Sequence, residues 1–338
     1  MSKIKLIDVA NLAGVSKSTA SQYLNGRFEY MSQKTKDRIS EAIKELDYVP
    51  NPIARSLKSD KTKTIGVVVR DITGFDTSRV IRGIDDFCKS GEYNVLIYNT
   101  DFDPEVEARS IQALHQLRVD GLIIASSGNN TSLIRDYQNK GLPIVQFQLE
   151  HDHTDKSIVI SDYKTAAYEA TDYLIKLGHN RICFVTQNFE SVKSRSERFQ
   201  GYVAALDKHN IPLDESLIEY WRRGTGLVNS ITNIINVSKP PTALFSQHLA
   251  ITTDLLSELA NANINIPDDI SLVGFDELPM AKFFKVPVTV VKQDPYKIGT
   301  ETAKLLLEHI KDTSLSPKKI LVPCKLVERH SCRNLKRG

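Results

Sequence analysis

The sequence contains no apolar stretch that approaches the roughly 20 residues needed to span a membrane. Its N-terminal segment, MSKIKLIDVA, has no long apolar region, so we expect no secretory signal. The four cysteines, Cys88, Cys183, Cys324 and Cys332, are scattered without a CxxC pair, which favours buried free thiols over a disulfide or a zinc site. We therefore expect a cytoplasmic protein without membrane contact.

The sequence also lacks the short motifs that mark common catalytic and cofactor sites. It has no GxxxxGKS/T, GxSxG or HExxH segment, and no GxGxxG segment after an expected strand. Gly224-Thr225-Gly226 begins like a dinucleotide-binding loop, but Asn229 occupies the third glycine position. His151-Asp152-His153 has metal-binding residue types, for which an exposed polar loop is the simpler interpretation. We predict a binding protein rather than an enzyme, with no cofactor and no metal site.

Positive charge is concentrated near the N-terminus. The whole chain carries a net charge of +3, whereas residues 1–59 alone hold ten basic and six acidic side chains, a net charge of +4. The remaining residues therefore sum to about −1. A basic segment attached to a nearly neutral body is typical of a nucleic-acid-binding domain.

The first 49 residues have the pattern of a helix-turn-helix. Apolar residues recur at helical spacing at Leu6, Val9, Ala10 and Ala13. Gly14 suits a left-handed helix end, and Ser16 can cap a second helix from Lys17 to about Asn25. A third helix begins after Ser32 and buries Ile39, Ala42, Ile43 and Leu46. The short turn Gly14-Val15-Ser16 between the first two helices defines the motif.

The second helix buries little and presents polar side chains outward. Small residues at its start would allow close approach to a major groove, and Gln22 can pair with an adenine edge. We predict the DNA contacts of the head at Lys5, Lys17, Ser18, Ser21, Gln22 and Asn25. The alternative is a solvated face of a small helical bundle.

The segment after the third helix has the properties of a hinge. Pro50 and Pro52 end one helix, and Ile53–Lys58 is too short to be a stable helix alone. Leu57 would act as a minor-groove wedge, with Arg55 and Lys58 on phosphates. The alternative is a linker whose Leu57 packs on the body.

These segments resemble the LacI/GalR family of bacterial transcriptional regulators. The resemblance rests on LIDVANLAGVSKSTASQYLNG, on KTKDRISEAIKELDYVPNPIARSLKSDKTKTIGVVV, and on VDGLIIASS, LGHNRICFV, RFQGYVAAL and IPDDISLVGFDELPMA in the body. It implies that Lys17, Ser18 and Gln22 read bases and that Ala54 and Leu57 enter the minor groove. The family usually has arginine in place of Gln22, so we predict adenine rather than guanine at that contact. SQYLN and RFEYM also resemble regulators of ketodeoxygluconate use.

From Thr64 onward, apolar strands alternate with amphipathic helices in two comparable halves. This pattern predicts an α/β bilobal body of two doubly wound parallel-sheet subdomains, which resembles periplasmic binding proteins. One of the expected helices covers residues 226–237. The resemblance adds three chain crossings near 161, 291 and 321. It divides the chain into a head (1–49), a hinge (50–63), one lobe (64–161 with 292–320) and a second lobe (162–291 with 321–332).

The resemblance also places ligand-binding residues between the lobes, where ligands of such sheets bind at the carboxyl ends of strands. They are Thr73, Phe75, Asp76, Gln148, Ser194, Arg198, Trp221, His248 and Asp276. Arg198 suits hydroxyls or a carboxylate, and Trp221 a sugar face, although a structural ion pair and a core position are alternatives.

Two departures from the family pattern bear on the effector. Gln148-Leu149 and Gln247-His248 replace Asp-Arg and Asn-Asp, which removes two carboxylates, and His248 can carry a proton. The resemblance implies a sugar or sugar acid as effector, and these departures lead us to expect a sugar acid, such as a keto-deoxy sugar acid, rather than a neutral sugar. Control by a protein corepressor, or by no ligand, remains an alternative.

Together these features predict a homodimeric repressor on a pseudo-palindromic double-stranded operator. A small-molecule effector between the lobes would control operator affinity, by induction or by corepression. The alternative is a cytoplasmic sugar-binding protein or sugar-acting enzyme with an incidental helical N-terminus.

Overall fold

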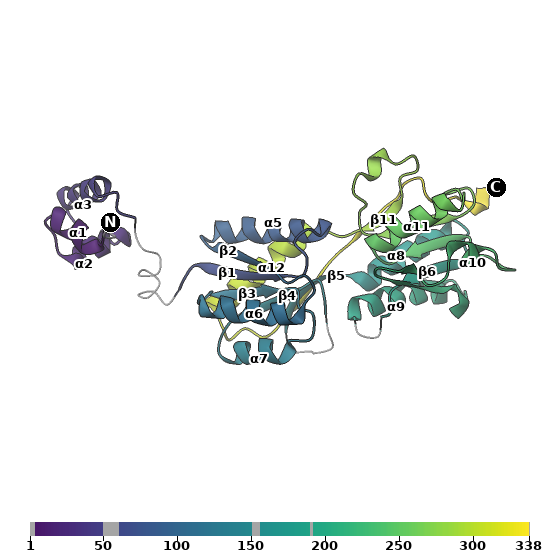
Figure 1. Cartoon of the computed structure of the whole chain (residues 1–338), viewed down its shortest axis with the longest axis horizontal. Coiled ribbons are helices and arrows are strands. Elements are labelled where there is room, and N and C mark those ends of the chain that lie inside the picture. Colours follow the sequence, from purple (N-terminus) through teal and green to yellow (C-terminus); the bar gives the residue numbers. More distant parts are fainter. Residues whose placement is uncertain (1–3, 50–60, 151–155, 190–191, 338) are drawn as a thin grey trace. The chain divides into compact units, whose positions relative to one another are not determined.

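The computed structural model describes residues 4–49, 61–150, 156–189 and 192–337 (Figure 1). Its contacts divide the chain into two compact units, Met1–Thr62, which contains the head, and Lys63–Gly338, here called the body. Among the described residues, every helix is too short or too polar to cross a bilayer. The predicted hinge residues Ala54, Arg55, Leu57 and Lys58 and the segment His151-Asp152-His153 lie outside the described residues.

The head is a three-helix unit that confirms the predicted helix-turn-helix. Its helices are α1 (Leu6–Leu12), α2 (Lys17–Leu24) and α3 (Gln33–Glu45). Gly14 has a left-handed φ of +59°, and the Ser16 hydroxyl accepts the Thr19 backbone N–H at 3.0 Å. The core between the helices consists of Val9, Ala13, Ile39 and Ala42. Gly14 therefore ends the first helix and Ser16 caps the second, as the sequence predicts.

The first lobe of the body is built on a six-stranded sheet in the order β12-β5-β4-β3-β1-β2, with every neighbouring pair parallel. Its strands are β1 (Thr64–Val69), β2 (Asn94–Asn99), β3 (Gly121–Ile124), β4 (Ile144–Phe147), β5 (Ser157–Ser161) and β12 (Lys319–Val322). Its helices are α5 (Phe75–Ser90), α6 (Pro104–Gln116), α7 (Thr131–Asn139) and α12 (Pro295–Lys311). The chain continues from the carboxyl end of each of these strands into the loops that face the second lobe.

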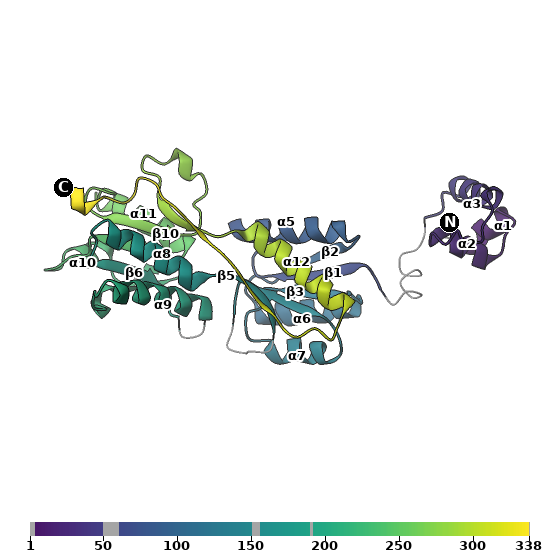
Figure 2. The ribbon, with the colours of Figure 1, turned by 180° about the vertical axis from the view of Figure 1, so that it is seen from behind.

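Both faces of this sheet are covered. One face packs with α5 and α12 around a core that includes Val67 and Ile84, and Figures 1 and 2 show these two helices on the same side. The other face packs with α6 and α7 around Val68 and Leu114. Alternate residues of β1 enter opposite cores because successive strand side chains point to opposite faces.

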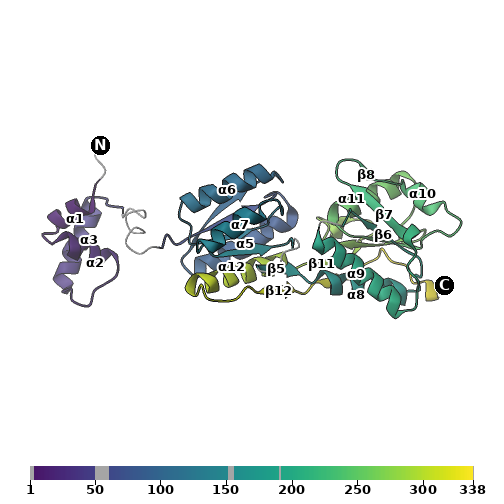
Figure 3. The ribbon, with the colours of Figure 1, turned by 90° about the horizontal axis from the view of Figure 1, so that it is seen from below.

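The second lobe has a seven-stranded sheet in the order β13-β11-β10-β9-β6-β7-β8. Its strands are β6 (Ile182–Thr186), β7 (Ile218–Arg222), β8 (Gly226–Leu227), β9 (Ala243–Ser246), β10 (Ser271–Phe275), β11 (Thr289–Lys292) and β13 (Lys325–Val327). Only the two edge pairs, β11 with β13 and β7 with β8, are antiparallel in the described residues. Two helices, α8 (Tyr163–Lys176) and α9 (Lys193–Lys208), cover one face of the sheet. The other face is covered by α10 (Ile231–Ile235) and α11 (Leu249–Asn261), as Figure 3 shows.

The expectation of a helix over residues 226–237 is wrong. Gly226 instead starts β8, which turns back on β7 and pairs Trp221 with Leu227. Gly224 and Gly226 both have positive φ values, +87° and +80°, which permit this tight turn. The helix is reduced to α10, which Ser230 caps through the Asn233 N–H.

Each lobe contains one pair of closely packed helices with glycine at the contact. A methyl group at Gly83 of α5 would overlap the Tyr296 carbonyl of α12, and one at Gly201 of α9 would overlap the Lys164 carbonyl of α8. Only glycine allows backbones to approach so closely. The chain passes between the sheets after β5, after β11 and after β12, so α12 and β12 complete the first lobe (Figure 2).

Candidate DNA-binding face and interlobe effector site

The polar face of α2 is open to solvent in the head. Lys17, Ser18 and Gln22 are exposed, whereas Ala20 on the opposite face is buried. Asn25 is exposed, and its side-chain amide donates to the Ser21 carbonyl at 2.8 Å. These side chains therefore share one accessible surface, and Asn25 also closes the end of the helix that carries them.

Two further head residues stabilise the helices around this face. The backbone N–H of Lys5 donates to the Asp8 carboxylate at 2.7 Å at the start of α1. Arg38 of α3 donates to the carbonyls of Ala13 and Gly14, the latter at 2.9 Å. Arg38 thus connects α3 to the turn of the helix-turn-helix, a role that spacing alone did not indicate.

Arg198 lies at the centre of the interlobe site, which we define as the loops and helix starts that follow the carboxyl ends of the strands in both sheets. Its guanidinium carbon lies 4.2 Å from the Tyr163 ring centre and 4.3 Å from the Phe275 ring centre. The side chain is only 7% exposed, and its Nε has no hydrogen-bond partner in the described structure. The alternative of a structural ion pair finds no partner among the described residues, so this buried cation has donors to offer.

Asp276 and Asp76 form a carboxylate pair at the same site. Asp276 follows β10 in a left-handed conformation with φ +79°, and Gln293 Nε2 donates to its Oδ1 at 2.6 Å. Gln293 also accepts from the Ser161 hydroxyl at 2.5 Å, so it connects the two crossing segments. Burial, together with the Asp276 charge, raises the pKa of Asp76 to about 7. Sequence reasoning missed Gln293.

His248 does not supply the positive charge that the sequence suggested. Burial lowers the pKa of its imidazole, against an opposing effect of Asp276. Its ring nitrogen Nδ1 accepts the Ala250 N–H at 3.2 Å at the start of α11. Burial therefore disfavours the charged form of His248, whereas the buried Arg198 brings positive charge to the site.

The remaining predicted residues divide between the site and its surroundings. Gln148 has φ +65°, and its carbonyl accepts the hydroxyl of Tyr163, whose ring contacts Arg198, at 3.1 Å. Ser194 is buried in the first turn of α9, four residues before Arg198. Thr73 donates to Asp71 at 2.6 Å, and Phe75 packs against its helix neighbour Arg79 at 4.2 Å.

Trp221 lies in the core rather than on a ligand surface. It is 5% exposed among the residues between the second sheet, α10 and α11. Its indole N–H donates to Asp254 at 2.6 Å. The structure therefore contradicts the stacking of Trp221 on a sugar face. Successive side chains of a strand point to opposite faces of the sheet, and that of Trp221 points towards α11.

Three arginines at the site were not predicted. Arg70 follows β1, Arg195 lies in α9, and Arg223 follows β7. Arg70 and Arg223 stand over the same aromatic ring, Phe102, at 5.3 and 5.2 Å. For Arg70 and Arg223 the available signal was their position directly after a strand, where ligand-binding side chains of parallel sheets gather.

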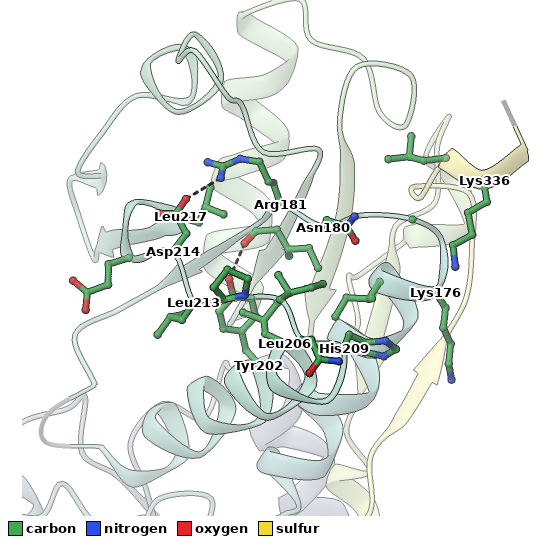
Figure 4. Close-up of a pocket in the computed structure, with 18 residues that line it drawn as sticks. Lys176, Asn180, Arg181, Tyr202, Leu206, His209, Leu213, Asp214, Leu217 and Lys336 are labelled. Atoms are coloured by element: carbon green, nitrogen blue, oxygen red, sulfur yellow. Dashed lines mark hydrogen bonds and ion pairs between the residues drawn. The ribbon is translucent and has the colours of Figure 1, made fainter.

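A large pocket elsewhere in the second lobe is not part of this site. It has a volume of about 980 Å³ and lies near Ile182, at the amino end of β6 (Figure 4). Several of its charged groups are paired: Arg181 with Asp214 at 2.8 Å, and Lys176 and His209 with Asp172. Within the described residues, no group of three or more His, Cys, Asp and Glu side chains could hold a metal ion.

Comparison with known proteins identifies the class to which this architecture belongs. Residues 5–51 match the family model described as bacterial regulatory proteins, lacI family, and residues 171–332 match the periplasmic binding protein-like domain. A helix-turn-helix head with such a body defines a bacterial DNA-binding regulator. The chain belongs to the LacI family of bacterial transcriptional regulators, and it is a transcriptional repressor rather than an enzyme.

Relatives of similar length support this assignment. "Probable HTH-type transcriptional regulator EndR" of Paenibacillus polymyxa is 37% identical over 305 residues, which cover 90% of this chain and 89% of the relative. "HTH-type transcriptional repressor PurR" of Vibrio atlanticus (strain LGP32) is 32% identical over 334 residues, which cover 97% and 98%.

Solved structures support the fold. The Lac repressor dimer bound to operator and the anti-inducer ONPF has a TM-score of 0.81 at 22% identity, covering 98% of this chain and 99% of that chain. A LacI family regulator from Enterococcus faecium with bound ribose has a TM-score of 0.66 at 26% identity, covering 80% and 99%.

Proposed function

We propose that this repressor binds a pseudo-palindromic operator as a homodimer and that a sugar acid at the interlobe site controls its operator affinity. The head (1–49) reads a half-site, the hinge (50–63) enters the minor groove, and the two lobes bind the effector. The protein acts in the cytoplasm, where the DNA is. The effector assignment rests on Arg198. Its guanidinium is buried, its Nε has no hydrogen-bond partner, and it forms no ion pair in the described residues.

DNA reading rests on the exposed face of α2. Lys17 lies at the helix start, where a cation suits the phosphate backbone, and Gln22 is placed one turn further along. A glutamine amide donates and accepts at once, which matches N7 and N6 of adenine. Lys5, Ser18, Ser21 and Asn25 complete the contact set that we propose.

The operator preference is tested by selection from a randomised half-site library with the full-length chain. We expect adenine at the Gln22 contact and a shift to guanine in Gln22→Arg, because arginine pairs with guanine O6 and N7. Gln33→Arg, which adds the same charge on α3, is the control for nonspecific attraction to DNA. Selection of guanine by the unmodified chain would reject the proposed contact.

A carboxylate is the group that best complements Arg198. The guanidinium lies between two aromatic rings, which hold it by cation–π contact but satisfy none of its hydrogen bonds. A ligand carboxylate would accept paired N–H groups from it, whereas Asp276 and the Gln148 backbone offer partners for sugar hydroxyls. The Enterococcus faecium regulator holds ribose, a neutral sugar. The excess of arginine at the site here favours an acid.

Calorimetry on the full-length chain tests the effector class. The panel contains gluconate, galacturonate and a keto-deoxy hexonate, with glucose and ribose as neutral counterparts. We expect binding of at least one acid and a loss of roughly 10- to 100-fold in Arg198→Met, the scale for a charged hydrogen-bond pair. Arg181→Met, whose ion pair lies at the far pocket, is the matched control. Tight binding of a neutral sugar, unaffected by Arg198→Met, would overturn the assignment.

A further inference from the structure

Arg70 and Arg223 form a second cationic position at the interlobe site, separate from Arg198. Arg70 belongs to the first lobe and Arg223 to the second, yet both guanidinium groups lie within 5.3 Å of the centre of one ring, Phe102. Two like charges so close together repel each other. Neither arginine forms an ion pair within the part of the chain that the structure describes.

The surroundings of Arg70 leave its charge incompletely compensated. Its Nε is buried without a hydrogen-bond partner. Glu107 is a nearby carboxylate, but it is fully buried and accepts from Ser126, Ser127 and Asn130, with the Ser127 N–H at 2.7 Å. Desolvation accordingly lowers the pKa of Arg70, against the attraction of Glu107 and Tyr163.

Arg223 likewise has no ion-pair partner among the residues that the structure describes. It is exposed, and its charge interacts electrostatically with the Asp71 carboxylate. Asp71 already accepts the backbone N–H of Thr73 at 2.9 Å and its hydroxyl at 2.6 Å. The charge of Arg223 also acts on Arg70, Arg195 and His248, none of which is an anion.

Phe102 lies in a loop with a strained backbone conformation. It follows β2 in a left-handed conformation with φ +63°, directly after Asp101 with φ +50°. The ring remains 47% exposed. Non-glycine residues are strained in this conformation, and such residues gather at ligand-binding positions. Asn99 supports the loop, because its side chain accepts the Ile72 N–H at 2.9 Å and donates to Asp101 at 2.6 Å.

We propose that the effector carries a second anionic group, which binds between Arg70 and Arg223 beside the Phe102 ring. This inference rests on the proposed function, in which Arg198 binds the first acidic group. The effector is then a small polyhydroxylated dianion with anionic groups at both ends, a carboxylate at Arg198 and a carboxylate or phosphate at Arg70 and Arg223. Because the two arginines come from different lobes, the second anion also stabilises the arrangement in which the lobes approach.

Calorimetry with three acids tests the second position in the full-length chain. The probes are an aldarate with two carboxylates, a phosphorylated aldonate and the corresponding aldonate with one carboxylate. We expect one of the two dianions to bind at least roughly 10-fold more tightly than the aldonate, as a charge-assisted contact implies. A preference for the aldarate or for the phosphate identifies the second group.

Variants locate the effect. Arg70→Gln and Arg223→Gln should each weaken dianion binding by roughly 10- to 100-fold while changing aldonate binding less than about 3-fold. Arg222→Gln removes an exposed neighbouring charge and should change neither. Thermal unfolding and operator binding of each variant verify that it folds.

Two failures are distinguishable. If the aldonate binds through Arg198 and neither dianion gains affinity, the second position is wrong and the proposed function stands. If no acid binds and a neutral sugar does, both are wrong. Equal loss of aldonate and dianion binding in Arg70→Gln would also overturn the second position, because it would make Arg70 part of the first.

Discussion

Replacing Asp76 by asparagine should stabilise the body at neutral and alkaline pH but not at acidic pH. Asp76 lies in the first turn of α5, where burial and the like charge of Asp276 raise its pKa to about 7. Arg79 and Lys292 oppose this increase, and Glu277 adds to it. Because the folded state holds a proton that the unfolded state has lost, folding stability falls as the pH rises from about 4 to about 7.

The size of the effect follows from the pKa difference. Raising a carboxyl pKa from about 4 to about 7 corresponds to an upper limit of roughly 4 kcal/mol at high pH. Partial solvent access and the coupling to Asp276 reduce this, so we expect Asp76→Asn to be more stable than the unmodified chain by about 2 kcal/mol at pH 8. At pH 4 the carboxyl is protonated in the folded state and about half protonated in the unfolded state, so little of the difference should remain.

Urea unfolding of both proteins between pH 4 and pH 9 measures this difference. The control is Asp85→Asn on the same helix, which removes the exposed pair of Asp85 with Lys89 at 2.5 Å. An exposed pair of this kind contributes roughly 0–1 kcal/mol with little change across this range. A difference between Asp76→Asn and the unmodified chain that is flat with pH, or that shrinks as pH rises, would refute the buried carboxylate pair.

Three further predictions concern the head, the hinge and the helix packing. Arg38→Met should lower the stability of the head by about 1–3 kcal/mol, because it leaves the Ala13 and Gly14 carbonyls without their donor; an unchanged melting transition of the isolated segment 1–62 would contradict this. Leu57→Ala should weaken operator binding in an anisotropy titration and leave effector affinity in calorimetry unchanged, and equal operator affinity would reject the minor-groove wedge. Gly201→Ala should destabilise the body by about 1–3 kcal/mol in urea unfolding through its overlap with Lys164, whereas Gly141→Ala, with open space around it, tests the cost of a positive φ alone.

Local signals predicted much of the fold because they act over a few residues. Gly14 and Ser16 mark the turn of the head through their own φ and capping bond. Asp103 and Pro104 likewise start α6, where the Asp103 carboxylate accepts the Glu105 N–H at 2.7 Å. Alternation of apolar strands and helices predicted both sheets, because each element must bury one face or both.

The site was predicted less completely because it depends on pairs that are distant in the sequence. Arg70 and Arg223 meet over Phe102 only after two separate sheets have formed and approached. Trp221 illustrates a second difficulty: it is the buried residue of β7, between the exposed Tyr220 and Arg222, and the residue type alone did not reveal that it faces the core. His248 illustrates a third difficulty: a histidine can carry a proton, but its burial, which lowers the pKa of the imidazole, could not be read from the sequence.

The most direct measurement is the operator affinity of the full-length chain, on its selected operator, with and without the acid identified by calorimetry. We expect the acid to change the apparent Kd by roughly 5- to 150-fold, the usual range of such coupling, and to have no effect on Arg198→Met at the same concentration. A neutral sugar should leave both proteins unchanged. An operator affinity that the acid does not alter, or alters equally in Arg198→Met, would contradict control of the head by an anion at the interlobe site.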